Sequence, residues 1–466
     1  MAPMEPARKR PVGEFLDRVV WARLSNPAWI SVAGGVCASL GLMIFMVRVL
    51  GASWPGQFKI FFPDSFSFKN AAGLTPFSPA FYAAERPIAF PTLLFLLGRS
   101  TVVTVVVQTL LYGLAYLFGV RVACRILRQP ESRLLAGMAI IAIGLEPRFA
   151  LWNTHILSES LGMTLAAVSV MLWWRFSVTP GVVRLRWAGV ATIAWLTVRD
   201  SNVPPWMAVG VPALLIASFW WRGTDAEFRR SLRRWGVITL VVCLGVAVTQ
   251  SANGRNRYAT LNNVGLRVLP DAELTAWFVD QGMPTSPALV ERTGSSSFDD
   301  SWEMLKSPAL EEFRSWARGA GQRQMLVSYA RFAPHWVGAL YDDLPVLLNS
   351  DQSAYDAFHV AQRVPPALPG QLGGPTSRMG LLIWTLLAAV GLALAARRRG
   401  LQSIVLGLLL ASCFIDLYMA YVGDSVEVQR HMVGPLSRMV LVMVLCIATG
   451  LDAAFTSIRL RKVGSA

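Results

Sequence analysis

Long apolar runs separated by short basic clusters dominate this 466-residue sequence. A helix needs about 20 apolar residues to cross the hydrocarbon core of a bilayer, and runs such as Trp29–Leu50 and Leu401–Val422 have that length. Of all residues, 54% are hydrophobic and only 15% are charged, against about 25% charged in a typical soluble domain. A soluble protein of this composition would expose large apolar patches, so the sequence predicts an all-α polytopic membrane protein.

About ten segments qualify as candidate membrane spans by length and apolar character. The shortest stand in pairs around polar turns and are expected to extend further, because helices buried among others need fewer apolar residues. The candidate spans are Trp29–Leu50, Thr101–Val120, Leu134–Leu145, Leu161–Trp174, Trp187–Val198, Val203–Trp221, Val237–Gln250, Met379–Ala396, Leu401–Val422 and Gly434–Phe455.

The basic residues gather between these spans, as in Arg121–Arg133 and Arg397–Arg399, and the formal net charge is +15. Cytoplasmic loops of membrane proteins are enriched in Lys and Arg. If the N-terminus is cytoplasmic, every inner loop is basic and the short outer loops carry mixed charge. The pattern predicts a multi-pass protein of the inner (plasma) membrane with both termini cytoplasmic, and it explains the charge without a nucleic-acid partner.

Two long outer loops interrupt the spans. In the first, the apolar segment Pro87–Leu97 is too short to cross and is expected to lie along the interface as a juxtamembrane helix. In the second, the apolar spacing of Pro308–Arg318 and Arg323–Leu340 predicts a mainly helical insert. The chain thus divides into a cytoplasmic N-terminus (1–28), a transmembrane region (29–250) with a catalytic first outer loop (51–100), an extracytoplasmic insert (251–378), C-terminal transmembrane helices (379–455) and a cytoplasmic tail (456–466).

Asp64 stands among aromatic residues in the first outer loop, in the segment Phe61–Phe68. Apolar neighbours can raise the pKa of a carboxyl and suit it to general-base catalysis, and aromatic faces can hold a sugar ring. The structural alternative is that Asp64 caps a short helix, Ser65–Ala71, since Asp is a preferred N-cap residue.

Two further outer turns combine acids with an arginine. Glu159 follows Ser158 where an apolar segment begins, and ionisable residues at that depth usually serve a function. Alternatively, Ser158 caps the helix and Glu159 lies in its favourable first turn. Arg199 has the planar donor fork that suits phosphate, or else it is an interfacial arginine paired with its neighbour Asp200.

The outer turn Asp424–Pro435 places Arg430 and His431 side by side. A plain connector needs simpler turn chemistry, so this pair favours anion binding, and Arg86, before Pro87, adds a candidate cation. The five cysteines show no CxxC or Cys/His pairing, and no Walker A or dinucleotide-binding motif occurs in the required context. The sequence therefore indicates neither disulfides nor cytoplasmic ATP-driven chemistry.

Five short motifs follow one another in the expected outer loops. They are Pro63-Asp64-Ser65, Arg86-Pro87 to Pro91, Ser158–Leu161, a helix that ends in Arg199, and Arg430-His431 to Pro435. Their order and placement resemble the C-superfamily (GT-C) of membrane glycosyltransferases, which use polyprenyl-phosphate sugars, as in the protein-mannosyltransferase-like and lipid A aminoarabinose-transferase-like families. The resemblance covers most of the chain.

The resemblance implies inverting transfer of a sugar from a polyprenyl-phosphate donor to an envelope glycan, lipid or protein. It implies Asp64 as the base that deprotonates the acceptor, and Glu159 as a second acid that orients substrate or helps to hold a divalent cation. The first-loop acid has no adjacent Asp or Glu, so no metal-binding acid pair is implied and a divalent cation stays open as a cofactor. The donor-phosphate ligands implied are Arg199, Arg430, His431 and Arg86.

Other functions compete with this hypothesis. A transporter or flippase for an anionic lipid or solute would use the same charges, but broken helices or related halves are typical of it, and the sequence shows no related halves. A lipid-linked polysaccharide ligase or polymerase uses similar donors and outer Arg and His residues. A scaffolding membrane protein would not need acids and arginines together at several outer turns.

Overall fold

The computed structural model describes residues 63–76, 78–221, 225–349 and 374–464. Within these ranges the chain forms helices joined by turns, and no β-strand occurs. Seven helical stretches are long and apolar enough to cross a membrane, and the bent pair Pro130–Leu145 and Arg148–Thr154 would make eight. The prediction of an all-α, multi-pass protein is confirmed, and the first expected span, Trp29–Leu50, lies outside the described residues.

The observed spans follow the expected ones, mostly with an extra turn at one or both ends. Two expected spans fall short of a simple crossing: α10 (Val182–Leu196) has 15 residues and the helix Pro130–Leu145 has 16. The seven spans are α6 (Thr101–Ile126), α9 (Ser158–Val178), the stretch Asp200–Trp220, α13 (Ala226–Ala252), α22 (Arg378–Ala396), α23 (Gly400–Gly423) and α24 (Val428–Gly464). The stretch Asp200–Trp220 comprises η2 (Asp200–Asn202), α11 (Val203–Pro205), the π-helical turn η3 (Trp206–Gly210) and α12 (Val211–Trp220).

Local chemistry sets several helix ends. Ser100 is the N-cap residue of α6, and Asp225 accepts hydrogen bonds from two first-turn N–H groups of α13. Pro130 begins α7 (Pro130–Leu145), where its missing N–H leaves no acceptor unsatisfied. After α7 the chain bends through α8 (Pro147–Ala150) and η1 (Leu151–Thr154) before α9 begins.

α24 forms the centre of the bundle, where it packs against α7, α9, α22 and α23. Its residues between Met432 and Ala448 are almost all buried. Where α24 meets α22, a Cβ added to Gly450 would lie 2.4 Å from the Cα atom of Gly391. Only glycine permits two helix backbones to approach so closely, as is common between helices in membranes.

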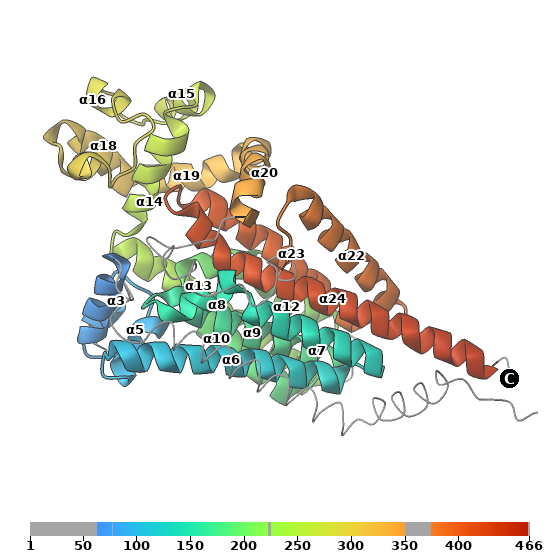
Figure 1. Cartoon of the computed structure of the whole chain (residues 1–466). Helices are drawn as coiled ribbons and strands as arrows, with labels where there is room; N and C mark the ends of the chain where they lie inside the picture. The colour runs from blue at the N-terminus through green and yellow to red at the C-terminus, as the bar shows by residue number, and fades with distance from the viewer. Residues whose placement is uncertain (1–62, 77, 222–224, 350–373, 465–466) are drawn as a thin grey trace, which may run out of the picture.

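The insert between α13 and α22 stands at one end of the bundle (Figure 1). Its helices bury Phe278, Phe313 and Trp336, which belong to the same hydrophobic core as the bundle, and the segment is mainly helical, as expected. Asn263 joins the insert to α23 by donating to the Tyr329 hydroxyl and the Val422 carbonyl, both at 2.9 Å. The insert comprises α14 (Asn256–Asn263), η4 (Val264–Val268), α15 (Ala272–Asp280), α16 (Pro287–Val290), η5 (Asp300–Trp302), α17 (Glu303–Lys306), η6 (Pro308–Leu310), α18 (Glu311–Arg318), α19 (Ala320–Arg331) and α20 (Ala333–Asn349).

The described part of the first outer loop lies at the same end, as α3 (Pro63–Gly73), α4 (Pro79–Tyr82) and α5 (Ala89–Leu96). α5 confirms the short apolar helix expected at Pro87–Leu97. Two hydrogen bonds hold the loop: the Ala89 N–H donates to the Thr197 carbonyl at the end of α10, and Asn253 donates to the Ala84 carbonyl. They bring the segments that carry Arg86, Arg199 and Arg255 together.

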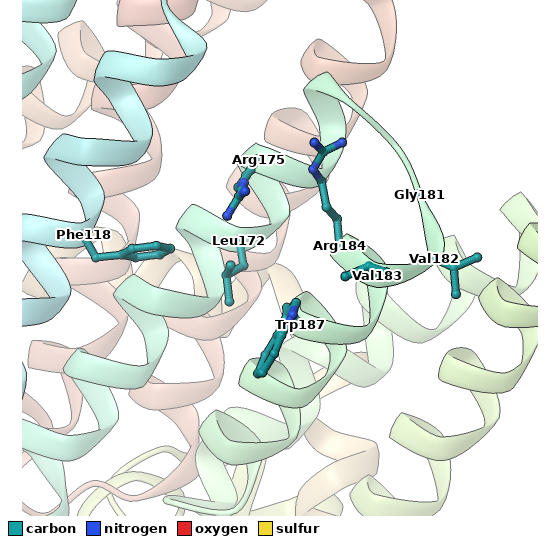
Figure 2. A pocket seen from close by; sticks show the side chains of 8 residues that line it. All are labelled: Phe118, Leu172, Arg175, Gly181, Val182, Val183, Arg184 and Trp187. Atoms are coloured by element: carbon teal, nitrogen blue, oxygen red, sulfur yellow. The ribbon is translucent and has the colours of Figure 1, made fainter.

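The other end of the bundle holds a large hollow. The last turns of α9 and the first turns of α10, with Phe118 of α6, border a cavity of about 530 Å3 (Figure 2). Arg175 and Arg184 lie on its wall. At a rise of 1.5 Å per residue, Arg175 is roughly 24 Å along α9 from Glu159, so the two ends of the bundle are distinct regions.

Candidate functional site

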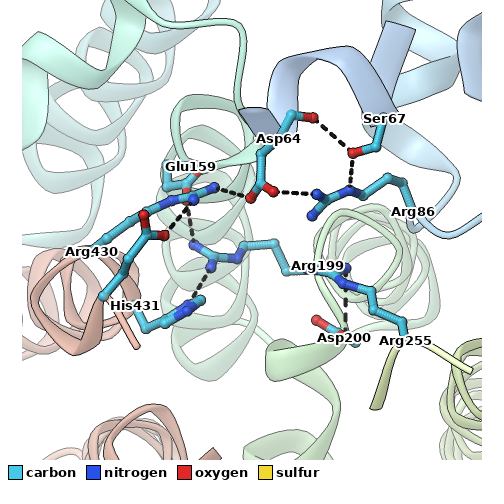
Figure 3. A network of polar contacts seen from close by, with 10 residues as sticks. Asp64, Ser67, Arg86, Glu159, Arg199, Asp200, Arg255, Arg430 and His431 are labelled. Atoms are coloured by element: carbon cyan, nitrogen blue, oxygen red, sulfur yellow. Dashed lines mark hydrogen bonds and ion pairs between the residues drawn. The ribbon is translucent and has the colours of Figure 1, made fainter. Parts of the chain in front are cut away.

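The expected outer turns meet at the end of the bundle that carries the insert. Asp64, Arg86, Glu159, Arg199, Arg430 and His431 all belong to one network of hydrogen bonds and ion pairs (Figure 3). They come from α3, the α4–α5 turn, α9, the α10–η2 turn and α24, which are far apart in sequence. Every predicted site residue therefore lies in the same place.

Arg430 is the centre of the network. Its Nη2 lies 2.9 Å from Asp64 Oδ2, its Nε donates to Glu159 Oε1 at 2.6 Å, and its Nη1 donates to Glu427 Oε2 at 2.8 Å. One guanidinium thus joins carboxylates from three segments of the chain. The planar fork of arginine makes such multiple contacts possible, which lysine could not reproduce.

Arg86 holds Asp64 from the other side. Its Nη2 donates to Asp64 Oδ1 and its Nε donates to the Ser67 hydroxyl, each at 2.5 Å. The guanidinium also lies over the ring of Phe68, 4.6 Å from the centroid. An aromatic residue near Asp64 therefore supports an arginine through a cation–π contact.

The pKa of Asp64 differs from the expectation. Burial raises the pKa of this carboxyl, but the charges of Arg430 and Arg86 outweigh burial and hold it well below its ordinary value. The predicted rise was wrong because the sequence shows the aromatic neighbours and not the arginines that fold onto them. Asp64 is also not a helix cap, since α3 begins at Pro63 and Asp64 lies in its first turn.

Arg199 bridges the second acid and the histidine. Its Nη1 lies 3.5 Å from Glu159 Oε1, and its Nη2 lies 3.1 Å from His431 Nδ1. A guanidinium can only donate, so His431 accepts through Nδ1 and is neutral with its proton on Nε2. His431 therefore offers an N–H donor to a ligand, in place of the positive charge that was expected.

The structural alternatives for Glu159 and Arg199 are confirmed only in part: Glu159 does lie in the first turn of α9. The N-cap position of α9 is Leu157, without a side-chain cap, and Ser158 is already helical. The ion-pair partner of Asp200 is Arg255, with Nη1 3.8 Å from Oδ2, while Arg199 pairs with Glu159. Arg199 and Asp200, which were expected to pair with each other, thus each pair with a residue from another segment of the chain.

Three charged residues of the network, Asp200, Arg255 and Glu427, were not among the predicted site residues. Arg255 follows Gly254, which has a φ of +71° and lies two residues after the end of α13. The sequence placed Arg255 in the insert and gave it no role. Glu427 has a φ of +56°, a conformation that costs a non-glycine residue of order 1–3 kcal/mol and is often found at functional sites. Arg255, like Arg199, stands a few residues beyond the outer end of an apolar helix. That shared position is the sequence signal that could have identified Arg255.

The solvent exposure of the side chains increases from one side of the network to the other. The Glu159 side chain is 0% exposed and that of Arg430 6%, whereas Asp64 and Arg255 are each 28% exposed. A ligand can therefore reach the network from its Asp64 and Arg255 side.

Below Glu159 lies a cavity of about 10 Å3, bordered by Arg199 and by the ion pair Asp416–Arg438, which measures 3.0 Å. That volume is about the space one water needs. Two buried atoms that belong to lining residues, Glu159 Oε2 and Arg438 Nε, have no hydrogen-bond partner among the described protein atoms. A single bound water there would satisfy such groups.

The donor set does not fit a divalent cation. The described residues contain no group of three or more His, Cys, Asp or Glu side chains placed to hold a metal. Asp64 and Glu159 share Arg430, and each has a second arginine beside it. These guanidinium charges would repel a cation at the same oxygens.

The arrangement suits exchange of an anion. Four arginines (Arg86, Arg199, Arg255, Arg430) face four carboxylates (Asp64, Glu159, Asp200, Glu427), so an incoming phosphate can take arginine contacts that the carboxylates now hold. No model of a known protein family matches the chain, and no curated protein sequence matches it. The function is therefore inferred from the geometry of the site.

Proposed function

We propose that this protein is a membrane glycosyltransferase of the GT-C kind. It moves a sugar from a polyprenyl-phosphate donor to an envelope glycan, lipid or protein. The observation that carries the proposal is the meeting of Asp64 and Glu159 on Arg430, with Arg86 and Arg199 beside the same acids. An acid that can accept a proton and several phosphate-binding arginines are what such a transfer needs in one place.

The proposed topology has ten spans, with both termini in the cytoplasm and the insert outside the inner (plasma) membrane. The basic clusters support it, because Arg128, Arg175 and Arg397 lie near the helix ends remote from the Arg430 network. The network then faces the extracytoplasmic side, where a lipid-linked donor reaches it from the bilayer.

In the proposed reaction the acceptor hydroxyl attacks the anomeric carbon of the donor sugar. The new C–O bond forms as the bond from that carbon to the phosphate oxygen breaks, and Asp64 takes the hydroxyl proton. The polyprenyl phosphate leaves with both electrons of the broken bond, and the arginines stabilise its charge. A single displacement of this kind inverts the anomeric configuration.

Asp64 starts as a weak base, because Arg430 and Arg86 hold its pKa low. Donor binding resolves this difficulty. As the phosphate takes contacts from Arg86 and Arg430, Asp64 loses their charge and its pKa rises toward the ordinary value. The base is thus strengthened only when the donor is in place.

The decisive experiment measures sugar transfer by purified protein in lipid nanodiscs. A panel of radiolabelled polyprenyl-phosphate sugars is offered with envelope lipids, glycans and proteins as acceptors. We expect label from at least one donor to move to an acceptor, and Asp64→Asn to abolish that movement. Asp342→Asn, at an exposed residue of the insert, is the matched control that should retain transfer.

No transfer from any donor, together with movement of the intact lipid donor between leaflets, would favour a flippase. Transfer of whole oligosaccharides from lipid-linked glycans would favour a polysaccharide ligase. Transfer that Asp64→Asn leaves near normal would remove Asp64 as the base.

A further inference from the structure

The cavity of about 530 Å3 at the end of the bundle remote from the Arg430 network has no part in the proposed reaction. Its size falls in the range of about 300–1,000 Å3 found for small-ligand sites. Its wall combines Arg175 and Arg184 with apolar side chains, among them Leu172, Val183 and Trp187 (Figure 2). Two cations beside an apolar wall match a molecule with an anionic head and a hydrocarbon tail.

The two arginines are available to a ligand. Arg175, in the last turn of α9, forms no ion pair or hydrogen bond with any described residue. Arg184 donates one hydrogen bond, from Nη1 to the Thr179 carbonyl at 2.5 Å. That bond closes the turn between α9 and α10 and leaves most of the five guanidinium N–H donors for other partners.

The apolar wall continues along α10, away from the arginines. Val183 is 63% exposed, Trp187 62% and Val190 49%. These residues recur at positions i, i+4 and i+7 and therefore share one outward face of the helix. Tryptophan is enriched where protein meets the headgroup level of a membrane, so this stripe lies where an acyl chain would run.

We propose that this cavity binds an anionic phospholipid. The phosphate lies between Arg175 and Arg184, and one acyl chain follows Val183, Trp187 and Val190 along α10. Basic pockets between membrane helices are known to hold acidic lipid headgroups. The lipid would join the α9 and α10 ends and so brace the helix that carries Glu159 at its other end.

Native mass spectrometry of the full chain, stripped of lipid in detergent, tests the proposal. Phosphatidylglycerol and phosphatidylcholine with the same acyl chains are added in turn. We expect one phosphatidylglycerol per chain to bind at least about tenfold more tightly than phosphatidylcholine. Arg175→Ala with Arg184→Ala should remove this preference, and Arg175→Lys with Arg184→Lys should keep most of it, because lysine retains the charge.

The matched control is Arg186→Ala, on α10 and exposed but not part of the cavity wall. It should leave the preference intact. Equal binding of both lipids, or phosphatidylglycerol binding that survives the double alanine variant, would overturn the proposal. Inorganic phosphate and glycerol 1-phosphate are separate competitors. If either binds as tightly as phosphatidylglycerol, the site takes a soluble anion and the lipid assignment is wrong.

A change of thermal stability separates loss of the site from loss of the fold. The double alanine variant should retain the melting temperature of the wild type in the absence of lipid. In the wild type, phosphatidylglycerol should raise that temperature, since a ligand that binds only the folded state stabilises it. The double alanine variant should show no such rise.

Discussion

The two ends of α24 carry aspartate–arginine clusters of opposite character. Near its start, Arg430 is shared among Asp64, Glu159 and Glu427, and further arginines stand beside the same acids. Near its other end, Asp452 pairs with Arg399, and its second carboxylate oxygen accepts from the backbone N–H groups of Arg128 and Gln129 at 2.8 and 2.7 Å.

The Asp452 cluster is closed. The Asp452 side chain is 0% exposed and every contact lies between α24 and the ends of α6, α7 and α23. Such a carboxylate joins three helix ends and has no spare partner for a ligand. A buried and fully satisfied pair of this kind has a structural role, since removal of one partner leaves an uncompensated charge.

The Arg430 cluster is open by comparison. Two of its pairs are long, at 3.5 and 3.8 Å, its acids and arginines are equal in number, and its outer residues Asp64 and Arg255 are partly exposed. Carboxylates and arginines therefore stabilise the fold where each atom has one fixed partner. Where the partners can be exchanged, the same residues can bind a ligand. The predictions below test this contrast, from the largest expected effect to the smallest.

The largest effect is expected for Asp64→Asn. Removal of a general base lowers turnover by about 10²–10⁴-fold, and we expect that loss in the sugar-transfer assay. Asn removes the charge that pairs with Arg86 and Arg430, but it is isosteric, the side chain is partly exposed and Arg430 keeps Glu159 and Glu427, so the melting temperature should fall less than for Asp452→Ala. A loss of both folding and activity would mean that Asp64, like Asp452, has a structural role.

Asp452→Ala should have the reverse effect. Breaking a buried ion pair costs about 3–5 kcal/mol, because Arg399 and two backbone N–H groups lose their acceptor. We expect a clear fall in the temperature of thermal inactivation in detergent, with turnover per folded molecule preserved. Asp225→Ala, which removes only an exposed helix cap, is the control and should cost about 1 kcal/mol.

Arg430→Lys should raise the donor KM by roughly tenfold, since about 1.4 kcal/mol is lost when a bidentate guanidinium contact becomes a point contact. The acceptor KM should change less. A donor KM equal to that of the wild type would show that Arg430 holds the acids in place and does not touch the donor phosphate.

Arg255→Lys should have a smaller effect, about two- to fivefold on the donor KM. The pair with Asp200 is long, at 3.8 Å, and 28% of the Arg255 side chain is exposed, so solvent screens its charge. Titration of the donor with both variants at two salt concentrations measures the difference. An Arg255→Lys effect as large as that of Arg430→Lys would make Arg255 the main phosphate ligand.

The sequence was a good guide to the fold. Apolar runs are long enough to specify helices by composition alone, and the positive-inside rule placed Asp64, Glu159, Arg199 and Arg430 on one side before any geometry was known. α10 was harder, because its 15 residues are too few to give a strong length signal.

The pairing within the site could not be predicted in the same way. Arg86 and Asp64 are 22 positions apart and Arg430 and Glu159 are 271 apart, so no local pattern connects them. The sequence showed Asp64 beside aromatic residues and suggested a raised pKa. The fold brought two arginines to it and reversed the direction.

The smallest expected effect concerns pH, and it separates the free enzyme from the donor complex. The depressed pKa of Asp64 in the free protein means that its ion pairs with Arg430 and Arg86 are present above the unfolded-state pKa. They are lost only as the pH falls through the depressed folded-state pKa. Between about pH 5 and 8 neither stability nor kcat/KM, which reports the free enzyme, should change through Asp64.

The profile of kcat should differ, because it reports the complex. There the donor phosphate takes contacts from Arg86 and Arg430, and the pKa of Asp64 rises toward its ordinary value of about 4. We therefore expect the acid limb of the kcat profile to lie at higher pH than the acid limb of the kcat/KM profile. In Asp64→Asn the acid limb should be absent from the pH profile of the residual activity. An acid limb at the same pH in both profiles would show that the arginines stay on Asp64 when the donor binds, and the Arg430 network would then be as closed as the Asp452 cluster.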